Sequence, residues 1–169
     1  TGLLSMARIM GACLPSGIEK EIREVYDDLL FYQEHTYGAA ESISDPLCEN
    51  SVVQWNEKAS YAWDAVKRSG ILREKALGIL QGAVGKCDTA SICVFNTLNL
   101  KRSGMVTVFI DHEILPVGKK FKIADPEGKE QKARLLRSRS EGSYWAIWVQ
   151  DIPANGFKTF RIIKGGKCI

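Results

Sequence analysis

The sequence lacks most of the short motifs that identify a self-contained active site. The patterns GxSxG, GxGxxG and HExxH are absent, and so is the glycine-rich P-loop of nucleotide-binding proteins. Only two histidines occur among the 169 residues. These absences argue against serine hydrolases of the α/β type, dinucleotide-binding enzymes, P-loop enzymes and zinc proteases.

Long apolar runs and paired cysteines are missing as well. No run of about 18 apolar residues exists, so no membrane-spanning segment and no membrane partner are predicted. The cysteines number 5, an odd count, and none has the CxxC or Cys/His spacing of a zinc site. They are interpreted as free or buried thiols, although a disulfide remains open, and they do not identify a compartment. The five are Cys13, Cys48, Cys87, Cys93 and Cys168.

Charge is divided unevenly between the two halves of the chain. Residues 1–89 carry 9 Lys and Arg against 13 Asp and Glu, whereas residues 90–169 carry 14 against 7. This difference suggests two units of different character. The second unit is basic, but its cations are spread over turns and strand faces without a nucleic-acid-binding signature, so no nucleic-acid partner is predicted.

The first half has the apolar periodicity of helices. A short helix is predicted over residues 2–13. A second helix is predicted with Ser16 as its N-cap and Glu19 completing a capping box. A third is predicted from about residue 50 to residue 82, with a possible break at Ser69-Gly70. Its expected buried stripe consists of Val52, Trp55, Ala59, Ala62 and Val66 at helical spacing, continued by Leu72, Ala76, Leu77 and Leu80. Trp63 is likewise interpreted as a packing residue.

The second half changes to the two-residue period of strands. Six strands are predicted between turn signals such as Asp125-Pro-Glu-Gly128. We therefore predict an α+β protein, with a small antiparallel three-helix bundle over residues 1–88 and an antiparallel β-sandwich-like domain over residues 89–169. The expected strands are 91–96, 105–110, 119–123, 132–138, 144–150 and 157–163.

The segment from Phe31 to Glu41 is the strongest candidate for chemistry. It places Glu34 and His35 at or just after the end of the second helix. An imidazole there could ligate a metal or move protons, but adjacent residues point in different directions and cannot close a metal site that needs three or four ligands. A histidine hydrogen-bonded within the bundle is the alternative.

Two other groups of polar residues carry less weight. Asp27 and Asp28 are adjacent on a helix and diverge by about 100°, so they cannot act as the facing carboxylates of a glycosidase. His112 lies between Asp111 and Glu113 in a charged turn, where we expect it to be exposed and without a functional role.

Two stretches of the sequence resemble the family 38 glycoside hydrolases, the α-mannosidase family. The first runs from Leu29 to Ala39 and is similar to the segment of the family's helical middle domain that carries a zinc-binding histidine. The second is an ordered series of motifs similar to the opening of the family's C-terminal β region. That series consists of Val94–Leu98, Arg102–Val106, Asp125–Gly128 and Asp151–Phe160.

This resemblance implies a retaining mechanism that uses zinc and acts on glycans with α-linked mannose. His35 is implied as a zinc ligand, and Glu34 and Thr36 as substrate-contacting residues. Many members of the family have His-His-Asp where this chain has Glu34-His35-Thr36. The nucleophile and the other zinc ligands are implied to lie in an N-terminal α/β catalytic domain that this sequence does not contain. No catalytic residue is therefore assigned here, and the chain alone is expected to be inactive.

A noncatalytic carbohydrate-binding or scaffold module is the alternative function. Strand alternation places Tyr144 and Trp148 on one face of a sheet and Trp145 on the other. Because a sandwich core uses only one face, the other face is left as a possible platform for a sugar.

Overall fold

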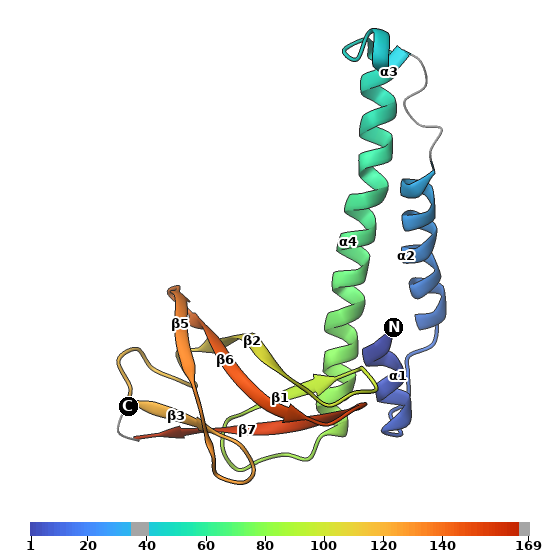
Figure 1. Ribbon diagram of the computed structural model, residues 1–169. Coiled ribbons are helices and arrows are strands. Elements are labelled where there is room, and N and C mark those ends of the chain that lie inside the picture. Colours follow the sequence, from blue (N-terminus) through green and yellow to red (C-terminus); the bar gives the residue numbers. More distant parts are fainter. Residues whose placement is uncertain (35–40, 166–169) are drawn as a thin grey trace. The chain divides into compact units, whose positions relative to one another are not determined.

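The computed structural model describes residues 1–34 and 41–165. It divides between Val84 and Gly85 into two compact units, the first helical and the second built from strands (Figure 1). The predicted α+β fold class is therefore confirmed. Within the described residues, no helix is both long and apolar enough to cross a membrane.

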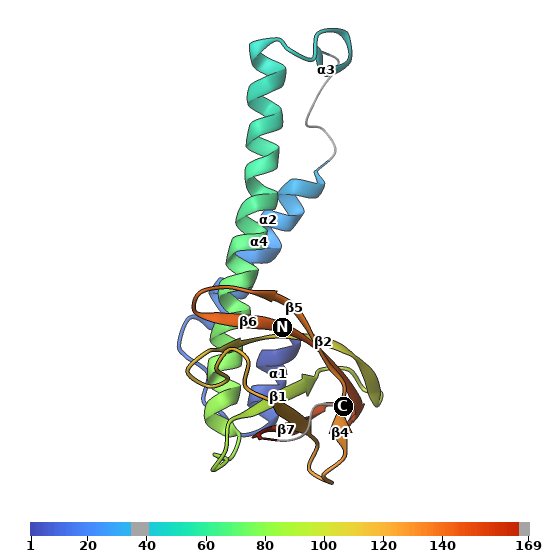
Figure 2. The same cartoon turned by 90° about the vertical axis from the view of Figure 1, so that its left-hand side faces the viewer.

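The helical unit is built on two long antiparallel helices. Its helices are α1 (Gly2–Ile9), α2 (Ile18–Gln33), the short α3 (Glu41–Ser44) and α4 (Glu49–Ala83). Figures 1 and 2 both show α2 beside α4, with the first turns of α4 extending beyond the end of α2. A small core joins α1, α2 and α4 through Leu4, Ile18 and Ala76, all nearly inaccessible to solvent.

Ion pairs reinforce the contact between α2 and α4. Arg68 of α4 places Nη1 2.6 Å from a carboxylate oxygen of Glu24 and Nε 3.3 Å from Asp28 Oδ2. Lys75 lies 2.6 Å from Glu21, about two helical turns further along α4 than Arg68. Because the helices are antiparallel, the later residue of α4 pairs with the earlier residue of α2. The ion pairs therefore favour one register of the two helices.

The predicted start of α2 was wrong in detail. Ser16 does not cap the helix, and no capping box with Glu19 forms. Gly17 occupies the N-cap position with φ of +87°, and its carbonyl accepts the N–H groups of Lys20 and Glu21. A left-handed backbone costs glycine nothing and other residues much more, so the chain turns sharply into α2 at this glycine.

The buried stripe predicted for α4 was wrong in its first half only, because Ala76 and Leu80, which the prediction also placed in it, are buried. Val52, Trp55, Trp63 and Val66 are 40%, 57%, 73% and 66% exposed, and the helix continues through Gly70 without a break. The buried residues of α4 are Ser51 and Ala65, which lie outside the predicted stripe, and Ala76 and Leu80, which lie within it. Helical periodicity detects both stripes, but only tertiary packing decides which one is covered in the described chain.

The second unit contains two antiparallel sheets, as the predicted sandwich-like domain requires. One sheet has the order β1-β7-β3-β4 and the other β2-β6-β5. All six predicted strands occur, and the two-residue strand β4 was missed. The strands are β1 (Ser91–Asn96), β2 (Arg102–Asp111), β3 (Phe121–Ala124), β4 (Glu130–Gln131), β5 (Ala133–Ser138), β6 (Gly142–Ile152) and β7 (Gly156–Lys164).

The core of this unit lies between the two sheets. Ile147 and Val149 of β6 face Ile123 of β3 and Phe160 of β7, and each of the four is at most 2% exposed. Burying four such side chains contributes about 1.5–3 kcal/mol each, which makes this cluster the main source of stability in the unit.

Asn96 ties the end of β1 to the β6–β7 turn. Its buried amide donates to the carbonyls of Leu100 at 2.8 Å and Pro153 at 2.9 Å, and its Oδ1 accepts the Leu98 N–H. Asn155 in turn donates its N–H to the Leu98 carbonyl. Two of the motifs that carry the family resemblance are thereby joined in space.

The Asp125–Gly128 turn is held by a buried carboxylate. Asp125 accepts the Lys129 N–H at 2.8 Å, and its other oxygen lies 3.5 Å from Nζ of Lys158. Burial favours the neutral acid, but the Lys129 hydrogen bond and the Lys158 charge outweigh it and lower the pKa of Asp125. For Lys158, burial disfavours the charged form, but Glu127 and Asp125 outweigh this effect and raise the pKa.

Candidate functional site

The candidate metal ligand follows directly after helix α2. His35 and Thr36 lie outside the described residues, so their predicted roles stay predictions. Glu34, the third predicted site residue, is described and is half-buried at the C-terminal end of α2. The structure therefore describes the end of α2 up to Glu34, the residue that precedes the predicted ligand in the sequence.

The backbone of Glu34 is held by a lysine from α4. Lys58 Nζ donates a hydrogen bond to the Glu34 carbonyl at 2.7 Å, while the Glu34 N–H donates to the Phe31 carbonyl at 3.3 Å. Glu34 has φ of −58° and ψ of 128°, which is extended rather than helical. A cation on the last carbonyls of a helix also compensates the negative end of the helix dipole. The chain thus leaves α2 from a fixed point.

Aromatic contacts fix the same helix end from the side. The rings of Phe31 and Tyr61 stack with their centroids 5.3 Å apart and 21° between their planes. Lys58 Nζ also lies 6.0 Å from the centroid of the Tyr32 ring. Lys58 and Tyr61 of α4 thus both contact the last turn of α2.

Sequence reasoning did not find Lys58, because the stripe to which it belongs is identified only once the burial along α4 is known. The buried residues Ser51 and Ala65 stand seven positions before and after it on α4. A lysine at this spacing belongs to the stripe facing α2, where a charged group needs a specific partner. The Glu34 carbonyl is that partner.

The residues around this helix end are suited to only part of a metal site. The imidazole of His35 is a good zinc ligand by type, and the anchored backbone before it suits a fixed coordination geometry. Among residues 1–34 and 41–165, however, no three His, Cys, Asp or Glu side chains gather closely enough to hold a metal ion. The described residues therefore do not supply a complete set of metal ligands.

The expectation that His112 would be exposed was wrong. It is half-buried, and both ring nitrogens are hydrogen-bonded, Nδ1 to the Ser140 carbonyl at 3.1 Å and Nε2 to Ser143 Oγ at 3.0 Å. A carbonyl only accepts, so Nδ1 carries a proton. In the neutral ring, Nε2 then accepts the Ser143 hydroxyl proton. Ser138 lies 2.9 Å from the same Ser143 oxygen and completes a chain of polar groups.

The tryptophans of β6 are divided between the two faces as alternation predicts. Trp145 packs against the core cluster, with its ring 4.8 Å from that of Phe121 in an edge-to-face contact. Trp148 is 40% exposed on the opposite face. On that outer face the ring of Tyr144 lies 5.0 Å from Phe109 and 5.0 Å from the guanidinium of Arg137.

The four described cysteines, Cys13, Cys48, Cys87 and Cys93, are all free thiols. This agrees with the interpretation of these four as unpaired. Burial raises the pKa of Cys93, and a hydrogen bond with Thr159 only partly offsets it. Its thiol is accordingly a poor candidate for a reactive nucleophile.

Comparison of the fold with solved structures finds family 38 glycosyl hydrolases. A protein of glycosyl hydrolase family 38 from Enterococcus faecalis aligns with 99% of this chain at a TM-score of 0.66 and 16% sequence identity. An alpha-mannosidase from Enterococcus faecalis V583 aligns with 97% at a TM-score of 0.65 and 15% identity. At these identities the likeness concerns the fold.

The chain spans only part of these similar structures. It covers 23% and 21% of the two Enterococcus chains. No protein-family model matches the sequence, and no curated protein matches it.

Proposed function

We propose that this chain is part of a zinc-dependent, retaining glycoside hydrolase of the α-mannosidase type. The observation that carries this proposal is the alignment of nearly the whole chain, 99% and 97% of it, with two structures of that kind. The sequence resemblance at Leu29–Ala39 and in the β region points independently to the same family. The substrate is a glycan with α-linked mannose.

In this proposal the end of α2 presents residues to an active site completed by an N-terminal α/β domain. His35 holds the metal, and Glu34 and Thr36 contact substrate. Bound zinc would supply orientation and polarisation of sugar hydroxyl groups. The role of Lys58 and Tyr61 is positional, since they contact the end of α2 that precedes His35 in the sequence.

In this proposal Asp27 and Asp28, the adjacent carboxylates of α2, are not the catalytic pair of a retaining glycosidase. Such a pair must face each other about 5–5.5 Å apart. Asp28 is engaged by Arg68, and its neighbour Asp27 is exposed on another side of α2. The nucleophile and the acid are therefore assigned to the N-terminal domain.

The proposal is tested with an aryl α-mannoside as substrate. The parent protein should hydrolyse it, lose activity on chelation and regain activity with zinc. The 169-residue chain should show no turnover with or without zinc. Turnover by the isolated chain would refute the assignment of the nucleophile to another domain, and a parent inactive on every α-mannoside would refute the substrate class.

A carbohydrate-binding module is a second candidate, favoured by the outer face of the β2-β6-β5 sheet. This face exposes Trp148 beside Met105, its cross-strand partner, and Tyr144 beside Phe109. Aromatic rings on a flat sheet are suited to stacking on pyranose rings. Titration with mannose oligosaccharides should then change the fluorescence of the wild type but not of Trp148→Ala, whereas an unchanged wild-type spectrum would exclude this function.

A further inference from the structure

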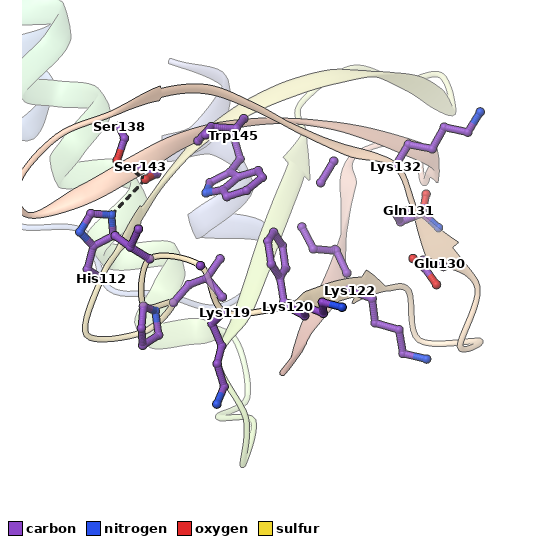
Figure 3. A pocket seen from close by; sticks show the side chains of 18 residues that line it. His112, Lys119, Lys120, Lys122, Glu130, Gln131, Lys132, Ser138, Ser143 and Trp145 are labelled. Carbon is purple, nitrogen blue, oxygen red and sulfur yellow. Dashed lines mark hydrogen bonds between the residues drawn. The ribbon is translucent and has the colours of Figure 1, made fainter. Parts of the chain in front are cut away.

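The β-sandwich contains a pocket that the proposed glycosidase function does not use. It has a volume of about 810 Å³ and is lined by residues of β3, β5 and β6 and by the segment 115–120. Pockets for small molecules typically measure about 300–1,000 Å³, so its size suits such a ligand. Figure 3 shows Trp145 above the pocket and Lys119 and Lys120 below it.

The pocket exists because strand β5 is not covered by the opposite sheet. Leu135 pairs with Trp145 and Ala133 with Ile147, so both lie on the inner face of their sheet. Leu135 is nevertheless 49% exposed. An inner-face leucine exposed to this extent forms an apolar wall that the described residues cover only in part. Such a wall favours a ligand with an apolar body.

One polar atom in the wall has no partner. Within the described part of the chain, the indole Nε1 of Trp145 is buried and makes no hydrogen bond. Figure 3 shows its nitrogen-bearing edge turned toward the end of the pocket where Ser143 and His112 lie. A buried N–H without an acceptor costs about 1–3 kcal/mol, and a ligand acceptor would remove that cost.

The other uncharged polar side chains and the histidine of the pocket already have hydrogen-bond partners. Ser138, Ser143 and His112 are bonded to one another, and the Gln131 amide donates to the Lys129 carbonyl at 3.0 Å. A sugar needs many hydrogen-bonding partners, which this pocket does not offer. A ligand with a single acceptor group fits better.

The charged side chains around the pocket indicate the charge of the ligand's acceptor group. Four lysines line it against one acidic residue, Glu130. Figure 3 shows Lys119, Lys122 and Lys132 reaching outward around its edge. Their combined potential favours an anion without forming a buried ion pair. The lysines that line the pocket are Lys119, Lys120, Lys122 and Lys132.

We propose that this pocket binds a small aromatic or cyclic anion, with its apolar body against Leu135 and Phe121 and its anionic oxygen accepting from Trp145 Nε1. The site is separate from the proposed glycosidase function and does not depend on it. Three features of the pocket indicate this ligand. The exposed inner-face wall favours an apolar body, the unpartnered indole N–H favours an acceptor group, and the lysine-rich edge favours a negative charge.

The test uses 2-naphthoate and its neutral counterpart 2-naphthylmethanol with the 169-residue chain. Calorimetry should give measurable binding of the naphthoate, weakened by added salt, and binding of the alcohol at least about tenfold weaker, as loss of a charge-assisted hydrogen bond predicts. The indole N–H resonance that disappears in Trp145→Phe should shift in the wild type on addition of naphthoate. Equal binding of anion and alcohol, or no shift, would overturn the proposal.

Substitutions at two exposed strand positions locate the ligand. Ala133→Trp fills the pocket from β5 and should abolish binding, whereas Thr107→Trp places the same side chain on the outer face opposite Ala146 and should leave it unchanged. Naphthoate binding that survives Ala133→Trp would overturn the site. Binding to this chain but not to the parent protein would also overturn it, because the pocket would then be filled by another segment of the parent.

Discussion

Lys58 Nζ donates a hydrogen bond to the backbone carbonyl of Glu34 across a separation of 24 residues, at a distance of 2.7 Å. This contact connects α4 to the residue that precedes the predicted zinc ligand. It acts on a carbonyl and not on a side chain, so it fixes where the chain leaves α2 whatever residue follows. Lys58 is accordingly a positioning residue in the proposed site.

Replacing Lys58 should therefore weaken zinc binding in the parent protein. We expect Lys58→Met to lower zinc affinity by about tenfold, the effect typical of losing a group that orients a ligand. Competition with a chromogenic chelator measures the affinity. Lys67→Met is the matched control, because Lys67 is an exposed α4 lysine whose side chain lies 3.8 Å from Asp64 of the same helix. Equal zinc affinity of Lys58→Met and Lys67→Met would contradict the positioning role of Lys58.

Arg68 should matter more to the helical unit than its exposure alone suggests. It contacts both Glu24 and Asp28, and the Asp28 side chain is only 15% exposed. Arg68→Met should destabilise the unit by about 1 kcal/mol, at the upper end for partly exposed pairs. Thermal unfolding followed by helical circular dichroism measures this change. Arg73→Met, which breaks an exposed pair with the neighbouring Glu74, should shift the midpoint far less.

The strands were predictable from the sequence, but the covered face of α4 was not. Ser91–Asn96 and Asp125–Gly128 form the expected strand and turn because alternation and turn chemistry act locally. In α4 the stripe containing Trp55 and the stripe containing Ala65 both satisfy helical periodicity. Which one packs depends on where α2 lies, and that is tertiary information.

The polar contacts were the least predictable part of the structure. His112 was expected to be exposed because its sequence neighbours are charged, yet it bonds Ser143, which lies 31 residues away. Lys58 was missed in the same way, since its partner is a backbone atom of another helix. Sequence patterns identify amphipathic faces, whereas contacts of this kind follow from the register between elements.

Asn96 should be a strong determinant of stability in the β unit. Asn96→Ala leaves the buried carbonyls around it without their donor, and we expect a loss of about 2–3 kcal/mol. Asn96→Asp should be destabilised similarly, because a carboxylate cannot donate to the Leu100 and Pro153 carbonyls. Urea unfolding followed by tryptophan fluorescence measures both variants. A fully stable Asn96→Asp variant would show that side-chain shape, and not donation, is what the position requires.

The Asp125–Lys158 pair should make stability depend on pH at both ends. Because the pKa of Asp125 is lowered in the folded protein, ionised Asp125 adds to the free energy of unfolding above the pKa of the unfolded chain, about 3.9. This stabilisation is lost as the pH falls through the pKa of the folded protein. Because the pKa of Lys158 is raised in the folded protein, charged Lys158 adds to the free energy of unfolding below the pKa of the unfolded chain, about 10.4. This stabilisation is lost as the pH rises through the pKa of the folded protein. The pair therefore stabilises the unit most between these limits.

Asp125→Asn tests the acidic side of this dependence. The urea midpoint of the variant should fall below that of wild type at pH near 7. The two should converge as the pH falls from about 4 through the lower pKa of folded Asp125, because the wild-type carboxylate becomes protonated over that range. Glu130→Gln, an exposed carboxylate on β4, serves as the control and should follow wild type. A difference between Asp125→Asn and wild type that stays constant down to pH 2 would contradict the assigned pKa direction.

The most direct test of the central claim is the zinc content of the purified parent protein carrying His35→Ala. His112→Ala is the matched control, since these are the only 2 histidines of the 169 residues. The proposal predicts that His35→Ala loses bound zinc and aryl α-mannoside hydrolysis together, while His112→Ala keeps both. A His35→Ala protein that retains stoichiometric zinc and wild-type turnover would contradict the claim that this chain supplies a metal ligand.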